Sequence, residues 1–262
     1  MTGGFDLYGF AATTMFTVAL AVFTFGVTYR LARFLFFWRR VPKASPRSRS
    51  SGDRIKGLIT TFLHPIIGGL KKNPPDAIAG LLALHILGVI PLIFLMDHHI
   101  AAFDNLLPKI GPLRYSLLKP LSVPLSLSDS ILRVQKGLAL HTIWGPLVVI
   151  LNGDVLAVMV LIGTGYKIGA WFVERARGAK NKRIGDLIAL LLIVAIVTTG
   201  FLAAHHLLPD VWDYRLVLGL HILLAELLLM VLPFTKFWHF VFGYWYGKLH
   251  EWYELKIVKG VV

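Results

Sequence analysis

The sequence has no cysteine and few charged residues for its length. Without cysteine the chain forms no disulfide, no thiolate-ligated zinc or iron–sulfur site and no covalent c-type haem attachment. Charged residues make up 16% of the 262 and hydrophobic residues 56%, whereas soluble domains average about 25% charged and roughly 45–50% apolar residues. This composition excludes a soluble globular domain and a disordered chain. The sequence also contains no glycine-rich phosphate loop and no internal repeat.

Long hydrophobic runs are what the chain has in abundance. Five of them approach the roughly 20 residues that an α-helix needs to cross a bilayer. We therefore predict an all-α integral membrane protein, a single membrane domain over residues 1–262 with a five-helix transmembrane bundle. The first run is too long for a cleaved signal peptide and no basic segment precedes it, so we interpret it as a retained anchor. The predicted spans cover about residues 8–38, 76–99, 154–173, 184–208 and 214–238.

The net charge of +13 is compatible with nucleic-acid binding, so its distribution along the chain is decisive. Lys and Arg gather between spans one and two, between spans three and four, and in the C-terminal tail, and the other loops carry few for their length. By the positive-inside rule the N-terminus is outside and the C-terminus in the cytoplasm, in the cytoplasmic membrane, with no nucleic-acid partner. Residues 39–75 are then a cytoplasmic linker and an interfacial helix near 55–70, and residues 101–153 an outer cap.

Histidine is the remaining side chain that can hold a redox centre. His221 and His239 are 18 residues apart, so on one continuous α-helix they share a face at about 27 Å separation. His85 and His99 are 14 residues apart, which is about 40° on an α-helix, and His98 is the alternative to His99. Because spans two and five run in opposite directions, His85 would pair with His239 on the inner side and His99 with His221 on the outer side. We predict that these pairs are axial ligands of two b-type haems, with one haem as the lesser possibility.

The segment from His221 to His239, HILLAELLLMVLPFTKFWH, resembles the last haem helix of the respiratory nitrate reductase gamma-subunit superfamily of membrane cytochromes b. The linker and interfacial helix before span two are more similar to the heterodisulfide reductase and Dsr-complex branch. The resemblance implies electron exchange between menaquinone or another quinone and a cytoplasmic iron–sulfur subunit, and it allows further membrane and outer-face redox subunits. Position 95, where many members have the second span-two histidine, is Leu here. The candidates for that ligand are His98, His99, His205 and His206.

A quinone site needs a pocket near a haem edge and a group that exchanges protons. Arg133, Lys136 and His141 of the outer cap are candidates, although each is more often a plain surface residue. Glu226 inside span five carries a proton, accepts a hydrogen bond from a haem ligand or pairs with a neighbouring helix. Three alternatives stay open: a nitrate reductase gamma-type quinol-oxidising subunit, a haem-free transporter, and a haem-free anchor. Whether the chain is itself an enzyme or only the electron-transfer subunit of an oxidoreductase complex also stays open.

Overall fold

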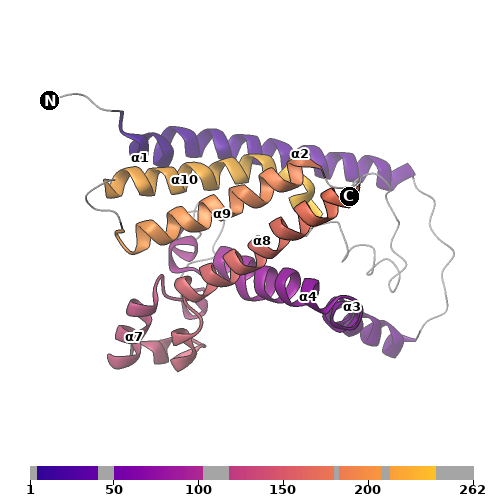
Figure 1. Ribbon diagram of the computed structural model, residues 1–262, viewed down its shortest axis with the longest axis horizontal. Coiled ribbons are helices and arrows are strands. Elements are labelled where there is room, and N and C mark those ends of the chain that lie inside the picture. Colours follow the sequence, from indigo (N-terminus) through magenta and orange to yellow (C-terminus); the bar gives the residue numbers. More distant parts are fainter. Residues whose placement is uncertain (1–4, 41–49, 103–117, 180–182, 208–212, 240–262) are drawn as a thin grey trace. The chain divides into compact units, whose positions relative to one another are not determined.

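The computed structural model is helical apart from short connections, and the residues that it describes contain no named strand (Figure 1). The described residues are 5–40, 50–102, 118–179, 183–207 and 213–239. Five helices among them are long and apolar enough to cross a membrane, which confirms the prediction of a multi-pass all-α chain. They are Leu7–Phe36, Pro74–Phe94, Gly153–Ala176, Ile184–Ala204 and Tyr214–Phe234.

The chain divides into two compact units, Met1–Asn73 with Ile222–Val262, and Pro74–His221. The first unit holds α1 (Leu7–Gly9), the π-helix η1 (Phe10–Met15), α2 (Phe16–Arg40), α3 (Ser51–Lys72) and the 3₁₀-turns η7 (Leu232–Phe234) and η8 (Lys236–Trp238). The second holds α4 (Pro74–Asp76), the π-helix η2 (Ala77–Val89), α5 (Ile90–Phe94), η4 (Lys119–Leu121), α7 (Leu127–Gln135), η5 (Leu138–His141), η6 (Gly145–Val149), α8 (Gly153–Ala176) and α9 (Ile184–Ala204). Helix α10 (Tyr214–Val231) begins in the second unit and continues into the first.

Helix α8 is the centre of the unit Pro74–His221, because it packs against both η2 and α9 (Figure 1). Gly163 allows α8 to approach η2 closely. A Cβ atom at this position would lie 2.5 Å from the carbonyl oxygen of Ala79, which no real side chain tolerates. Membrane helices commonly pack through such small residues. The close α8–η2 contact therefore fixes the helix that carries His85.

Short helices over residues 118–152 form a cap at the N-terminal end of α8 (Figure 1). The amide of Gly153 donates to the carbonyl of Pro124 at 2.9 Å, which joins the cap to the first residue of the helix. The predicted outer cap is thus a packed structure from residue 118 onward. A small buried apolar cluster lies where the cap meets the spans, and it consists of Met96, Val123 and Leu156.

Three predicted spans are not continuous α-helices. In span one the π-helix η1 lies between α1 and α2. Span two is wound as a π-helix through η2 and its helix ends at Phe94, after which a bridge from Met96 to Val123 interrupts the chain. Residues 97–102 are helical again. In span five α10 ends at Val231, two residues before Pro233, which cannot continue the helix. The unbroken α-helices assumed for the two histidine pairs are therefore wrong, and the angles calculated from them do not apply.

The amphipathic helix α3 is longer than the interfacial helix that the sequence predicts, although its place in the chain is as expected. The Ser50 side chain caps its N-terminus by accepting from the amide of Asp53. Large aliphatic residues four apart form one exposed stripe along it, as in helices that lie on a membrane surface. The linker residues 41–49 fall outside the described residues. The stripe consists of Ile55, Ile59, Leu63 and Ile67.

Candidate functional site

The four predicted axial histidines share one feature, a hydrogen bond from Nδ1 to a main-chain carbonyl oxygen. A carbonyl oxygen only accepts, so Nδ1 carries the proton and, in a neutral imidazole, the lone pair is on Nε2. Histidines that bind a metal through Nε2 adopt this tautomer, because their other nitrogen donates to a second-shell acceptor. The bonds are His85 to Gly80 at 2.5 Å, His99 to Leu92 at 2.7 Å, His221 to Ile196 at 2.9 Å and His239 to Lys236 at 2.7 Å.

Two neighbouring histidines, His205 and His98, have other surroundings. Nε2 of His205 lies 2.7 Å from Oδ1 of Asp154, so that nitrogen is already engaged by a carboxylate. The His98 ring lies against the His99 ring, with centroids 4.0 Å apart and an angle of 49° between the planes. The hydrogen bonds therefore favour His99 over His205 as the second ligand near His221.

His98, His99 and His221 lie together in the unit Pro74–His221. Burial, followed by the charges of His99 and His221, lowers the pKa of His98 to about 3. Burial also lowers the pKa of His99, against the opposing effect of its hydrogen bond to the Leu92 carbonyl. His99 and His221 interact electrostatically with each other as well. Burial of His98 and His99 thus favours the neutral imidazole, which is the form that binds iron.

Gly200 on α9 makes room for the His221 imidazole. A Cβ atom at Gly200 would lie 2.8 Å from Cε1 of His221, closer than real side chains approach. The Thr199 hydroxyl lies 3.4 Å from Nδ1 of His221, on the same side as the Ile196 carbonyl. The tautomer and this glycine cradle both fit a histidine that ligates haem iron.

His85 lies within the π-helix η2, and π-helical turns occur frequently at functional sites. The carbonyl that binds its ring belongs to Gly80. A Cβ atom at Gly80 would lie 2.5 Å from Cε of Lys167, so the lysine side chain lies directly over this glycine. Lys167 in turn forms an ion pair with Asp76. The Asp76–Lys167 ion pair therefore lies beside Gly80, whose carbonyl accepts the hydrogen bond from His85.

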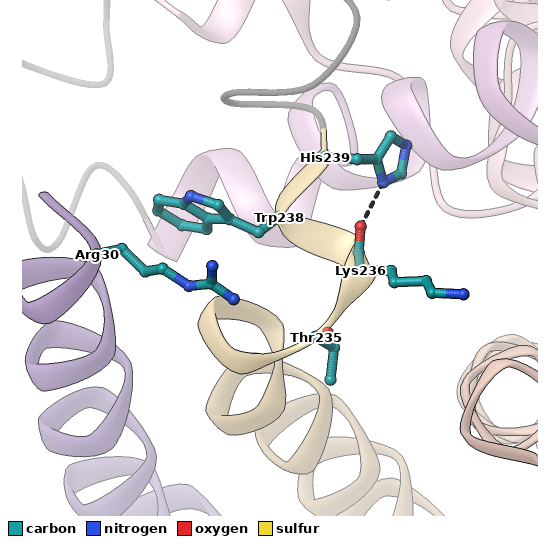
Figure 2. Close-up of a pocket in the computed structure, with 5 residues that line it drawn as sticks. All are labelled: Arg30, Thr235, Lys236, Trp238 and His239. Carbon is teal, nitrogen blue, oxygen red and sulfur yellow. Dashed lines mark hydrogen bonds between the residues drawn. The ribbon is translucent and has the colours of Figure 1, made fainter. Parts of the chain in front are cut away.

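His239 belongs to the other unit and lines a cavity of about 350 Å³. Arg30 reaches this cavity from α2, and its Nε donates to the Pro233 carbonyl at 2.7 Å. Figure 2 shows Arg30 and Trp238 on one side of the chain segment, with Lys236 and His239 pointing to the other side. The His239 ring is held by its bond to Lys236 beyond the end of α10, and not by a regular helix. The lining residues are Arg30, Thr235, Lys236, Trp238 and His239.

The three cap residues predicted near a quinone have different surroundings. Arg133 forms ion pairs with Asp97 at 2.6 Å and with Asp129 at 2.9 Å. Burial alone would lower the pKa of its guanidinium, but the hydrogen bonds to the two carboxylates raise it. Lys136 and His141 are exposed on the cap. Arg133 therefore ties α7 to the residue before His98, and the other two face solvent or the membrane surface.

A second cavity, of about 130 Å³, lies where the end of α9 meets the start of α10. From the sequence His206 is only an alternative haem ligand, and nothing distinguishes Asp213 or Tyr214 as functional residues. The sequence signal that could have found them is that His206, Asp213 and Tyr214, which can all exchange protons, lie close together in the chain. None of the three cap residues lines this cavity or the one at His239. Its lining residues are Leu202, Ala203, His206, Leu207, Asp213, Tyr214 and Val217.

Glu226 is the intramembrane acid that the sequence analysis singled out. Its side chain is buried, with 4% of the residue exposed, and its two carboxylate oxygens have no hydrogen-bond partner among the described residues. The alternative in which Glu226 pairs with a neighbouring helix therefore has no support in the part of the chain that the structure describes.

Comparison with known proteins finds no matching family model, no matching curated protein and no matching solved structure. The resemblance to the nitrate reductase gamma-subunit superfamily thus rests on the residues of this chain alone.

Proposed function

We propose that this chain is a membrane cytochrome b that holds two haem b groups and exchanges electrons between a membrane quinone and a cytoplasmic iron–sulfur subunit. The observation that carries the proposal is the shared tautomer of His85, His99, His221 and His239. In His99 and His221, donation from Nδ1 to the backbone leaves the lone pair on Nε2 for a metal. Haem iron bound there would supply one-electron transfer.

The residues of the outer pair, His99 and His221, belong to one unit and interact electrostatically. Both would hold the haem iron, and Gly200 leaves space for the His221 imidazole beside α9. The predicted inner ligands belong to different units, His85 to η2 and His239 to the segment after α10, and their pairing stays a prediction from the sequence. The Asp76–Lys167 ion pair beside Gly80 would hold the His85 ring in its orientation.

The proposed partner is an iron–sulfur subunit similar to that of heterodisulfide reductase, and it docks on the cytoplasmic side. The basic end of α3, with Lys71 and Lys72 both exposed, offers a surface for an acidic partner. The C-terminal tail, predicted to join this surface, lies outside the described residues. The quinone, menaquinone or a related one, would bind near the outer haem.

A reduced-minus-oxidised spectrum of the purified chain, with a pyridine haemochrome assay, tests the proposal. We expect a b-type spectrum with about two haems per chain. His221→Ala and His99→Ala should each leave about one haem. His205→Ala is the matched control, because Nε2 of His205 is engaged with Asp154, and it should keep both. A wild-type chain without haem, produced with ample haem supply, would overturn the proposal and leave the transporter and the anchor. A co-purifying molybdenum subunit would instead indicate the nitrate reductase type.

A further inference from the structure

Glu226 is an acid in the interior of a helix that is long and apolar enough to cross a membrane. The span is Tyr214–Phe234, and Glu226 lies about 18 Å along the helix axis from its first residue. Ionisable side chains at such a depth are rare and are usually functional. The residues one turn before and one turn after it are all apolar, and they are Ile222, Leu223, Leu229 and Met230.

The carboxyl group of Glu226 is enclosed without compensation. Both of its oxygens are buried, and neither has a hydrogen-bond partner among the described residues. Burial is the only influence on its protonation, because no charged or titratable group in the described part of any other helix acts on it. A lone carboxylate in apolar surroundings is costly and binds a proton instead. The Glu226 side chain is therefore favoured as a neutral carboxylic acid.

His221 precedes Glu226 on the same continuous part of α10, about 7.5 Å away along the axis and about 140° around it. Its Nδ1 donates to the Ile196 carbonyl of α9, so the Glu226 carboxylate is not the acceptor that orients this ring. Charges at separations of this order still interact strongly where water is excluded. A positive charge held at His221 would favour the Glu226 carboxylate, and its loss would favour the acid.

We propose that Glu226 is a proton-binding site inside the membrane, and that it takes up a proton when haem iron at His221 is reduced. The inference rests on the proposed function, because the change of charge at His221 comes from the haem. One electron from the quinol converts iron(III) to iron(II), and the Glu226 carboxylate takes one proton from water to become the acid. The net charge inside the membrane then stays the same. When the iron–sulfur partner removes the electron, Glu226 returns the proton to water.

Dicyclohexylcarbodiimide tests the proton-binding part of the proposal. This apolar reagent enters membranes, and its C=N bond adds the O–H group of a protonated carboxyl, which gives an adduct that mass spectrometry locates. We expect Glu226 to be labelled near neutral pH in the dithionite-reduced chain and more slowly in the oxidised chain. Glu174 is the internal control, because it is partly exposed in the last turn of α8 beside Arg175, and it should stay unlabelled in both.

Glu226→Gln tests the link to the haem, because glutamine keeps the shape of the side chain and binds no proton. Haem content and melting temperature should not change, since Glu226 is not a proposed ligand. In the wild type, reduction of one haem should become about tenfold less favourable per pH unit, which is about 59 mV in its midpoint potential. In Glu226→Gln this dependence should be lost. Glu174→Gln is the matched control and should keep it, and a purely structural Glu226 would leave it unchanged in both variants.

The two proposals fail in distinguishable ways. A wild-type chain without haem refutes the proposed function, and the redox-linked step falls with it, whereas labelling of Glu226 still reports whether this residue binds a proton in the membrane. If haem is present and Glu226 is not labelled, or if Glu226→Gln keeps the wild-type dependence of the potential on pH, this inference is overturned. Either result leaves the cytochrome intact.

Discussion

At the scale of single residues, Gly200 determines whether the His221 imidazole has room beside α9. A methyl group there would lie 2.8 Å from Cε1 of the ring. Gly200→Ala should therefore push the ring off its bond to the Ile196 carbonyl. We expect a loss of stability of about 1–3 kcal/mol from overpacking and a fall from about two haems per chain toward one. The pyridine haemochrome assay and the melting temperature measure the two effects.

Gly169→Ala is the control for this variant. Gly169 is also in a membrane-spanning helix, and a Cβ atom at that position meets nothing within 4 Å. Alanine there should keep the full haem content and, by its helix propensity, the same or slightly higher stability. If Gly200→Ala retains both haems, His221 is not held against α9 as described.

The sequence was sufficient to single out the four histidines, but not the atoms around them. The tautomer of each ring depends on carbonyl groups such as those of Ile196 and Leu92, which belong to other turns or other helices. The role of Gly200 is equally hidden, because a glycine in an apolar run carries no sign of what packs on it. The four histidines therefore stay predicted ligands, and the contacts that favour haem ligation could not be read from the sequence.

At the scale of elements, the spans were predictable and their internal winding was not. Hydropathy identifies a run of the right length, but it does not separate an α-helix from the π-helix η2. Pro233 lies in span five, where α10 ends at Val231 and two 3₁₀-turns follow. A proline removes one backbone hydrogen bond, and the packing around it decides whether the helix bends or ends.

The cap offers a prediction at this scale, because one arginine joins α7 to the chain before His98. Arg133 binds Asp97 and Asp129, and the Arg133 and Asp97 side chains are 28% and 22% exposed. Arg133→Met should destabilise the cap by about 1 kcal/mol, more than a fully exposed ion pair is worth. Hydrogen exchange over residues 119–135 should become faster, with a smaller change in α8.

Lys136→Met is the control for the cap, since Lys136 is exposed on the same short segment. It should leave exchange unchanged. Both residues were candidates for quinone binding, so the pair also separates that role from a structural one. If Arg133→Met leaves hydrogen exchange of the cap unchanged but is no longer reduced by quinol, Arg133 acts in quinone binding and not in holding the cap.

At the scale of the whole molecule, the five spans follow from composition, but the division into two units does not. The boundary falls within α10, so its first residues belong with α8 and α9 and the later ones with α2 and α3. Hydropathy reports how long each helix is and not which helices pack together. The contacts that decide this, such as that of Gly163 with η2, involve residue types that occur throughout the chain.

The orientation in the membrane is a prediction for the whole chain, and the absence of cysteine makes it directly testable. The positive-inside rule places α3 in the cytoplasm and the cap outside. Lys71→Cys on α3 and Lys136→Cys on the cap are both exposed positions in an otherwise cysteine-free chain. In intact spheroplasts a membrane-impermeant maleimide should label Lys136→Cys, and it should label Lys71→Cys only after permeabilisation. The reverse pattern would place His99, His221 and the cavity at His206 on the cytoplasmic side, and protons from quinol oxidation would then be released into the cytoplasm.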